Sequence, residues 1–164
     1  MGPIGGKDKD ACMLFTGETD RAIDDKHRLS IPTEHRAQLA GQLPAVVYAT
    51  PGPNGGIWVW PEETFIRMAA NLEDTLLPDD DEMDIVQVLF SQSQRLELDK
   101  TGRIRLPASL MELAGIGSHA VVLGARDHLE LCDPEEWAKV KPQKLAAMRE
   151  IMQRKAAGRR GRGT

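Results

Sequence analysis

Two short stretches of the chain place an aspartate, an arginine and a proline at the same spacing. Residues 22–32 read AIDDKHRLSIP and residues 97–107 read ELDKTGRIRLP, so the pattern D-x-x-x-R-x-x-x-P occurs twice, 75 positions apart. An aspartate at the start of a turn accepts hydrogen bonds from backbone amides, and its charge orients an arginine four residues later. An arginine oriented in this way offers a planar set of donors that matches phosphates and base edges.

The side chains of these turns fall into two expected roles. Asp24 and Asp99 are expected to shape the two loops. Gly102 suits a left-handed backbone conformation, and His27 occupies the equivalent position in the first copy. The residues expected to contact nucleic acid are the cations of the loops and of the following strand, namely Arg28, Arg103, Lys26, Lys100 and Arg105.

The same pattern also has a purely structural interpretation. A single D-x-x-x-R pair that closes a hairpin is common, and exposed ion pairs of this kind contribute little to stability. Duplication of the motif beside further cations favours binding, because two basic loops on one frame could follow a phosphate backbone and place guanidinium groups in a groove.

Histidine at position 27 is the main difference between the two turns. A histidine with positive φ costs roughly 1 kcal/mol relative to glycine. Either the first loop follows a different backbone path from the second, or His27 adds a contact of its own.

The two turns belong to a longer internal duplication. Three tripeptides recur in the same order at offsets of 74, 75 and 73: LAG at 39–41 and 113–115, AVV at 45–47 and 120–122, and PEE at 61–63 and 134–136. Each copy is therefore expected to contain the same supersecondary unit, repeated once.

Alternation of apolar and polar residues predicts the strands of each copy. Leu29 and Ile31, like Ile104 and Leu106, are expected to point inward while the arginines beside them point outward. Each copy continues with a short helix, the first of which is expected to stop at Gly41, and then with a hairpin. The hairpin strands are expected at 45–49 with 57–60 and at 120–124 with 129–132.

Three further helices are expected outside the repeated strands. One begins at Pro61, and a second covers residues 82–93, with Asp81 or Asp84 as its cap. The last helix follows residue 133, and Pro142 is expected to kink or divide it before a frayed basic end.

These elements predict an α+β, mainly β protein in which two repeats form one pseudo-symmetric domain with peripheral helices. The expected boundaries are a disordered extension at 1–12, a first repeat at 13–72, an acidic linker and helix at 73–92, a second repeat at 93–140, and a C-terminal helix and basic tail at 141–164.

Composition excludes several classes of function. The two cysteines are far apart and the histidines lack ligand spacing, so we expect no disulfide framework and no metal site. We find no phosphate-binding loop and no nucleophile–base arrangement, and therefore expect neither a cofactor nor an enzyme. Apolar runs are too short for a membrane span, which together with the cysteine usage makes the cytoplasm the expected compartment. The formal charge of −4 gives no overall attraction to nucleic acid.

The paired motif resembles that of a known family. The two DxxxR turns, the start MLFTG (13–17), the strands RLSIP (28–32) and RIRLP (103–107), and the duplicated arrangement resemble the MraZ family of bacterial transcription regulators. The resemblance covers roughly residues 13–150. It implies two tandem AbrB-like swapped-hairpin β-barrel repeats. In that family glycine usually precedes the arginine, as Gly102 does, whereas the first copy has His27.

The resemblance also implies a function and partners. Members are cytoplasmic, nucleoid-associated proteins that assemble into ring-like homo-oligomers. They bind repeated promoter elements in double-stranded DNA upstream of the division and cell-wall gene cluster. By this resemblance Arg28 and Arg103 would be the DNA-contacting arginines, supported by Asp24 and Asp99.

Two other functions stay open from the sequence. The same module occurs in autoregulating antitoxins that bind a toxin through an extended tail, and the second helix and basic tail could serve as that arm. A small hydrolase using clustered carboxylates is the enzymatic alternative.

Overall fold

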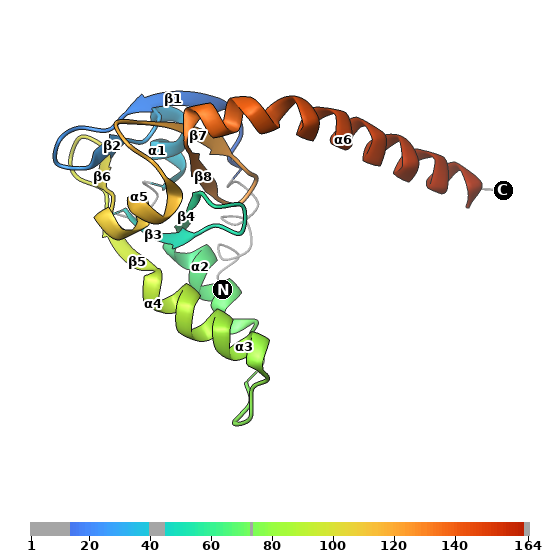
Figure 1. Cartoon of the computed structure of the whole chain (residues 1–164), viewed down its shortest axis with the longest axis horizontal. Coiled ribbons are helices and arrows are strands. Elements are labelled where there is room, and N and C mark those ends of the chain that lie inside the picture. Colours follow the sequence, from blue (N-terminus) through green and yellow to red (C-terminus); the bar gives the residue numbers. More distant parts are fainter. Residues whose placement is uncertain (1–13, 40–44, 73, 163–164) are drawn as a thin grey trace, which may run out of the picture. The chain divides into compact units, whose positions relative to one another are not determined.

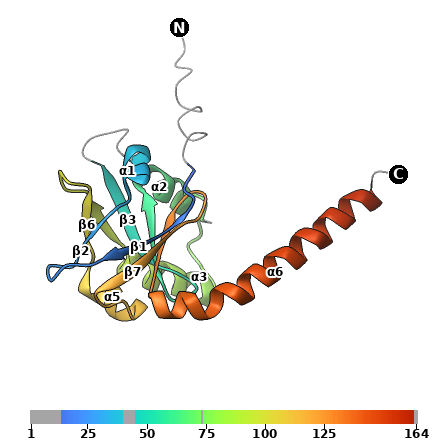
Figure 2. The same cartoon turned by 90° about the horizontal axis from the view of Figure 1, so that it is seen from above.

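The computed structural model describes residues 14–39, 45–72 and 74–162 (Figure 1, Figure 2). The expectations for residues 1–12 and for a helix stop at Gly41 concern residues outside these ranges. The chain divides after Asp133 into two compact units. The first contains the sheets and the shorter helices, and the second is one long helix.

Strands of the first unit form a six-stranded antiparallel sheet, in the order β1-β7-β8-β4-β3-β5, and a two-stranded sheet of β2 and β6. The hairpins β3–β4 and β7–β8 confirm the two hairpins expected from the sequence. The bounds are β1 Glu18–Ala22, β2 Arg28–Ser30, β3 Val46–Pro51, β4 Ile57–Pro61, β5 Gln94–Glu97, β6 Arg103–Arg105, β7 His119–Gly124 and β8 Leu129–Cys132.

Strand pairing connects the two repeats throughout. The first strand of each copy pairs with the third strand of the other copy, since β1 pairs with β7 and β5 pairs with β3. The second strands pair with each other as β2–β6, and the fourth strands as β4–β8. Neither repeat therefore completes a sheet without the other, and the two fold as one body.

The sheet differs from the expected barrel in one respect. Among the described residues the six-stranded sheet is open, with β1 and β5 at its two edges, and these two strands do not pair with each other. The two-stranded ribbon of β2 and β6 remains a separate sheet. The architecture is thus α+β and mainly sheet, without a closed barrel.

Apolar side chains of both sheets form one core. Leu29, Ile31, Ile104 and Leu106 are all buried, which confirms the inward phase predicted from the alternation. Further buried members come from the six-stranded sheet and the helices, including Phe15, Val47, Ile57, Val59, Leu110, Val122, Leu129 and Leu131. Because residues of both copies contribute, the core stabilises the duplicated arrangement as a whole.

Two equivalent helices, α1 (Thr33–Leu39) and α5 (Ala108–Ala114), follow the second strand of each copy. A third helix, α2 (Glu62–Ala70), confirms the expected helix but begins one residue later than predicted, with Pro61 as its cap. Its Phe65 stacks on Tyr48 of β3 with ring centroids 4.5 Å apart, and lies 5.9 Å from the ring of Phe90. These rings anchor the helices to the sheet.

The acidic region forms a continuous helical segment of α3 (Asp80–Asp84), a π-helical turn η2 (Ile85–Leu89) and α4 (Phe90–Gln92). Its cap is Asp79, whose side chain accepts a hydrogen bond of 2.8 Å from the amide of Glu82. The prediction of Asp81 or Asp84 as the cap was wrong, because the helix begins earlier and takes the acidic residues into its first turn, where the helix dipole favours them.

The second unit is the helix α6 (Pro134–Gly161). It runs through Pro142 without division and includes the basic residues Arg159 and Arg160 in its last turn. The expectation of a frayed basic end was therefore wrong. Basic residues near a helix C-terminus interact favourably with the helix dipole, which is a physical reason for the helix to continue.

Candidate nucleic-acid interface

The ribbon of β2 and β6 brings the cationic residues of the two copies together. Arg28 lies opposite Arg105, Leu29 opposite Ile104, and Ser30 opposite Arg103. Because side chains alternate along a strand, the leucine and isoleucine enter the core while the three arginines share the outer face. The two loops lie at opposite ends of this ribbon and project from the body at separate points (Figure 2).

In the first loop Asp24 organises both backbone and side chain. Its Oδ1 accepts hydrogen bonds from the backbone amides of Lys26 at 2.9 Å and of Arg28 at 2.8 Å. Its Oδ2 accepts one from Nε of Arg28 at 2.7 Å. One carboxylate therefore closes the turn and orients the guanidinium at the start of the strand.

In the second loop Asp99 makes the equivalent contacts. Its Oδ1 accepts from the amides of Thr101 and Arg103, both at 2.9 Å, and its Oδ2 accepts from Nε of Arg103, also at 2.9 Å. The Thr101 hydroxyl adds a bond of 2.8 Å to Oδ1. The two arginines are thus held by the same geometry at the two ends of the ribbon.

The backbone follows the same path in both loops. His27 has φ of 62° and Gly102 has φ of 79°, so both residues are left-handed. The carbonyl of His27 accepts from the amide of Leu106, at 2.8 Å, and that of Gly102 accepts from the amide of Ile31, at 3.0 Å. Each loop is therefore bonded to the strand of the other repeat, and the first loop does not take a different path.

Hydrogen bonding lowers the pKa of both aspartates. The backbone amide of Arg28 is the largest cause for Asp24, and the backbone amide of Arg103 is the largest cause for Asp99. Both carboxylates stay ionised at neutral pH and remain partners for the arginines. Nε is the guanidinium atom used in each pair. Within the described residues, the terminal nitrogens of Arg28 and Arg103 make no hydrogen bond, so they are available to a ligand.

Exposure separates the remaining candidate residues. Lys26 and Lys100 are exposed near the tips of the loops, and Arg105 is exposed on the ribbon. Asp24, Arg28 and Arg103 are half-buried, and Asp99 is exposed. The arrangement offers two guanidinium groups held by carboxylates and flanked by exposed ammonium groups, which suits contact with a polyanion.

Arg36 of α1 is a site residue that the sequence analysis missed. It donates from Nε to the carbonyl of Ile31 and from Nη1 to the carbonyl of Thr101, both at 2.8 Å. Its side chain also covers Gly102, where any Cβ would collide with it. The equivalent residue of the second repeat is Met111, so only the second loop is held by an arginine. Because the contact joins residues far apart in the sequence, no local pattern indicates it.

A second polar cluster lies away from these loops, around His128. The imidazole stacks against the rings of both Trp58 and Trp60, with centroids 4.2 and 4.3 Å away. Its Nδ1 bonds to Asp127 and its Nε2 to Glu130, each at 2.9 Å. Burial lowers the pKa of His128, but these two carboxylates outweigh burial and raise it. The two tryptophan rings and the two carboxylates therefore all contact this one imidazole.

Two features are absent from the part of the chain that the structure describes. No group of three or more histidine, cysteine, aspartate and glutamate residues in that part of the chain could hold a metal ion. None of the helices described there combines the length and the apolar character that a bilayer span requires.

Comparison with known proteins assigns the chain to a family. The model of the family described as "MraZ protein, putative antitoxin-like" matches residues 14–86 and 89–158, once for each repeat. The chain is 34% identical over 125 residues to the Transcriptional regulator MraZ of Nocardioides sp. (strain ATCC BAA-499 / JS614), covering 76% of this chain and 84% of that protein.

Two further relatives with the same name show a similar likeness. The Lactiplantibacillus plantarum protein is 31% identical over 133 residues, which cover 81% of this chain and 92% of that protein. The Heliobacterium modesticaldum protein is 31% identical over 141 residues, which cover 86% and 96%. With both repeats matched by the family model and relatives of this similarity over most of its length, the chain belongs to the MraZ family.

Proposed function

We propose that this protein is a transcriptional regulator, not an enzyme, and that it binds double-stranded DNA through the β2–β6 ribbon and its two loops. The name shared by the relatives supports the regulatory role. The observation that carries the site is the register of the ribbon, which puts Arg28, Arg103 and Arg105 on one outer face. A two-stranded ribbon has the dimensions that the major groove of DNA admits.

Within this proposal the cations have different tasks. Arg28 and Arg103 approach base edges with their terminal nitrogens, because Asp24 and Asp99 already hold the Nε atoms. Lys26 and Lys100, near the loop tips, contact phosphates and set the position of the ribbon on the duplex. Arg105 adds a cation opposite Arg28, at the first-loop end of the ribbon.

The proposal extends to the DNA target and the assembly. The target is a set of short repeated promoter elements upstream of the division and cell-wall gene cluster, and the protein acts at the nucleoid as a ring-like homo-oligomer. Strand exchange between the repeats supports a swapped-hairpin relationship of the two copies. In such an assembly weak contacts of single ribbons add up, provided that the spacing of the DNA repeats matches that of the subunits.

Replacing both ordered arginines tests the DNA-binding surface. We expect the double variant Arg28→Ala/Arg103→Ala to fold and to lose affinity for a promoter fragment by about 1–3 kcal/mol for each arginine that contacts a guanine. Affinity would be measured by fluorescence anisotropy, and folding by circular dichroism. Unchanged affinity in the folded double variant would refute this surface.

Arg95→Ala is the matched control. Arg95 is also ion-paired, through its Nε to Glu62 at 2.8 Å, but it lies on β5 outside the ribbon. Its replacement should leave DNA affinity unchanged. A loss equal to that of the double variant would mean that charge alone, and not the ribbon, decides binding.

An antitoxin-like function is the second candidate. It is favoured by the wording of the matched family description and by the long helix α6, which has no buried residue. Co-expression with a toxin encoded next to the protein would test it. If the toxin is neutralised by the Arg28→Ala/Arg103→Ala variant as well as by the wild type, toxin binding is a separate function of the chain.

A further inference from the structure

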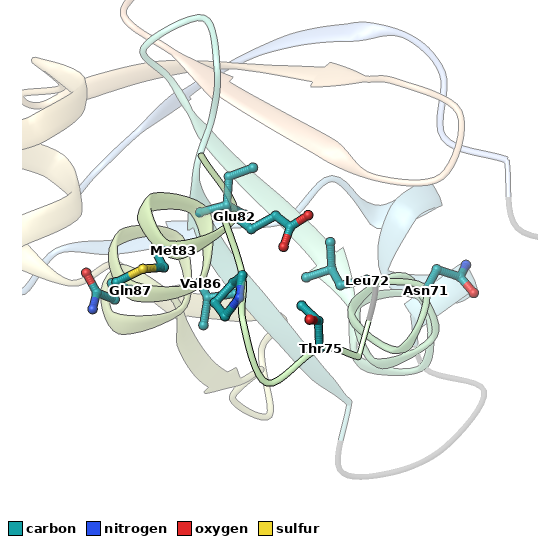
Figure 3. A pocket seen from close by; sticks show the side chains of 9 residues that line it. Asn71, Leu72, Thr75, Glu82, Met83, Val86 and Gln87 are labelled. Carbon is teal, nitrogen blue, oxygen red and sulfur yellow. The ribbon is translucent and has the colours of Figure 1, made fainter. Parts of the chain in front are cut away.

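A hollow of about 490 Å³ opens between the end of α2 and the segment formed by α3 and η2. We call it the α2–α3 groove. Leu72 lines one side, and Glu82, Met83 and Val86 come from the other (Figure 3). Ile85 and Pro78 complete its apolar lining. The groove is therefore an apolar surface with a carboxylate at its edge.

The surroundings of the groove are exposed and acidic. Leu76 and Leu77, in the loop that leads to it, are 99% and 89% exposed, and Val86 is 52% exposed. Residues 79–84 contain five carboxylates and no basic residue. Exposed apolar surface bordered by charge is typical of an interaction site, because a monomer gains nothing from leaving such side chains in water.

Helix α6 carries the complementary chemistry. Leu145, Met148, Ile151 and Met152 are all exposed, and their spacing of i, i+3, i+6 and i+7 places them on one face of the helix. Lys144 and Lys155, four residues before and seven residues after Met148, fall on the same face. In total the helix has eight basic and three acidic residues.

We propose that α6 of one copy of this chain docks in the α2–α3 groove of a second copy. Its apolar stripe covers Leu72, Met83 and Val86, while its lysines face the carboxylates of residues 79–84. The inference rests on the proposed self-assembly and names its interface. Because the helix and the groove are different surfaces of one chain, the contact is head-to-tail and extends to a ring when the rotation closes.

The occupant follows from the composition of the two surfaces. An amphipathic helix in an apolar groove is a recurrent recognition mode, anchored by side chains at i, i+3 and i+7. The groove is acidic, so it repels DNA and selects a basic partner. The chain itself supplies a basic helix with such a stripe, 28 residues long.

Two charge-introducing variants test the contact. Met148→Glu places a carboxylate in the stripe of α6, and Val86→Glu places one in the groove; both positions are exposed, so circular dichroism should show a wild-type fold. We expect the wild type to sediment as an assembly and each variant as a monomer at the same micromolar concentration. Ala146→Glu, on the opposite face of α6, is the matched control and should assemble as the wild type does.

Mixing the two variants distinguishes head-to-tail docking from other contacts. Each mixed pair keeps one intact helix and one intact groove, so an equimolar mixture should form a complex of two chains and nothing larger. A mixture that stays monomeric, a wild type that is itself monomeric, or wild-type assembly of either single variant would overturn the proposal.

DNA binding gives a separate readout. Both variants should bind a fragment with a single promoter element within about twofold of the wild type, because the ribbon is unaltered, and should lose only the gain from repeated elements. If the wild type and the variants assemble as expected but none of them binds DNA, only the proposed function is refuted. If Met148→Glu binds DNA but assembles as the wild type does, only the docking proposal is refuted.

Discussion

The position before the arginine differs between the two loops, and it shows how a side chain and its surroundings together determine the backbone conformation. His27 and Gly102 have nearly the same left-handed φ, although only glycine adopts it without cost. The aspartate contacts and the bond to the opposite strand hold His27 there. At Gly102 a second constraint exists, because Arg36 covers the position where a Cβ would lie.

Introducing glycine at position 27 and removing it at position 102 should therefore have opposite effects on the free energy of unfolding. His27→Gly removes the strain of a Cβ, and the free energy of unfolding should stay level or rise by up to about 1 kcal/mol. Gly102→Ala should lower it by about 1–2 kcal/mol from the backbone alone, and further because the side chain of Arg36 must move. Urea unfolding of both variants measures these changes.

Gly55→Ala provides the control for Gly102→Ala. Gly55 also has positive φ, at 90°, but nothing lies within 4 Å of the position of a Cβ. A smaller loss of stability at Gly55 than at Gly102 isolates the contribution of Arg36. Equal losses would show that Arg36 moves aside at no cost, and a clear loss in His27→Gly would contradict the strain argument.

His128 should make stability depend on pH. Its pKa is raised in the folded state, so the protonated side chain stabilises the fold below its unfolded value of about 6.5, and this contribution is lost as the pH rises through the folded-state value. The difference in free energy of unfolding between the wild type and His128→Gln should therefore shrink from pH 6 to pH 9. Urea unfolding at several pH values measures it.

An exposed histidine serves as the comparison. His119→Gln should show a difference from the wild type that changes much less over the same range, because this side chain has no carboxylate partner among the described contacts. A difference for His128→Gln that grows with pH would mean that the neutral imidazole is the form that the tryptophans and carboxylates stabilise.

At the scale of elements, the ribbon of β2 and β6 has a feature that stability alone does not favour. Arg28 and Arg105 are directly opposite, and like charges at such positions are destabilising in an antiparallel pair. The nearby Asp24 offsets the charge of Arg28, whereas the described contacts give Arg105 no such partner. A residue that costs stability and stays exposed on a shared face is typical of a binding surface.

Arg105→Ala should separate these two effects. We expect the free energy of unfolding to stay level or rise by a few tenths of a kcal/mol, about the size of other cross-strand effects, because the repulsion from Arg28 is removed. DNA affinity should fall in the same variant. Arg105→Lys, which keeps the charge but not the planar group, is the control and should retain part of the affinity. A loss of stability with unchanged affinity would assign Arg105 a structural role instead.

At the scale of the whole molecule, charge is segregated. The chain has a formal charge of −4, yet its cations gather on the ribbon and on α6 while carboxylates gather at residues 79–84. Binding to a polyanion therefore depends on local charge and not on the average. Such binding weakens steeply with salt, since each phosphate contact releases a counterion.

The two loop-tip lysines should appear in this salt dependence. In Lys26→Ala/Lys100→Ala the slope of log affinity against log salt concentration should fall in magnitude by about 2, because each phosphate contact contributes roughly 0.9. The loss of affinity should be similar for specific and random sequences. Lys139→Ala, on α6, should leave the slope on a single promoter element unchanged. An unaltered slope in the double variant would show that the lysines do not reach phosphates.

Local patterns in the sequence determined much of this structure. The duplication is visible as a repeat of local patterns about 75 positions apart. The hairpins, the inward phase of Leu29 and Ile104, and the turn-closing role of Asp24 and Asp99 all depend on residues within a few positions of one another. Side-chain periodicity and backbone preferences act over that range, so they can be recognised without a fold.

Only the tertiary structure decided which elements meet. The pairing of β2 with β6 places Arg105 opposite Arg28, and α1 delivers Arg36 to Thr101, 65 positions along the chain. The stacking of His128 on Trp58 and Trp60 depends on β4 pairing with β8 in a particular register. Such contacts between distant residues leave no periodic pattern in the sequence. They arise because each repeat leaves strand edges and apolar faces that the other repeat must cover.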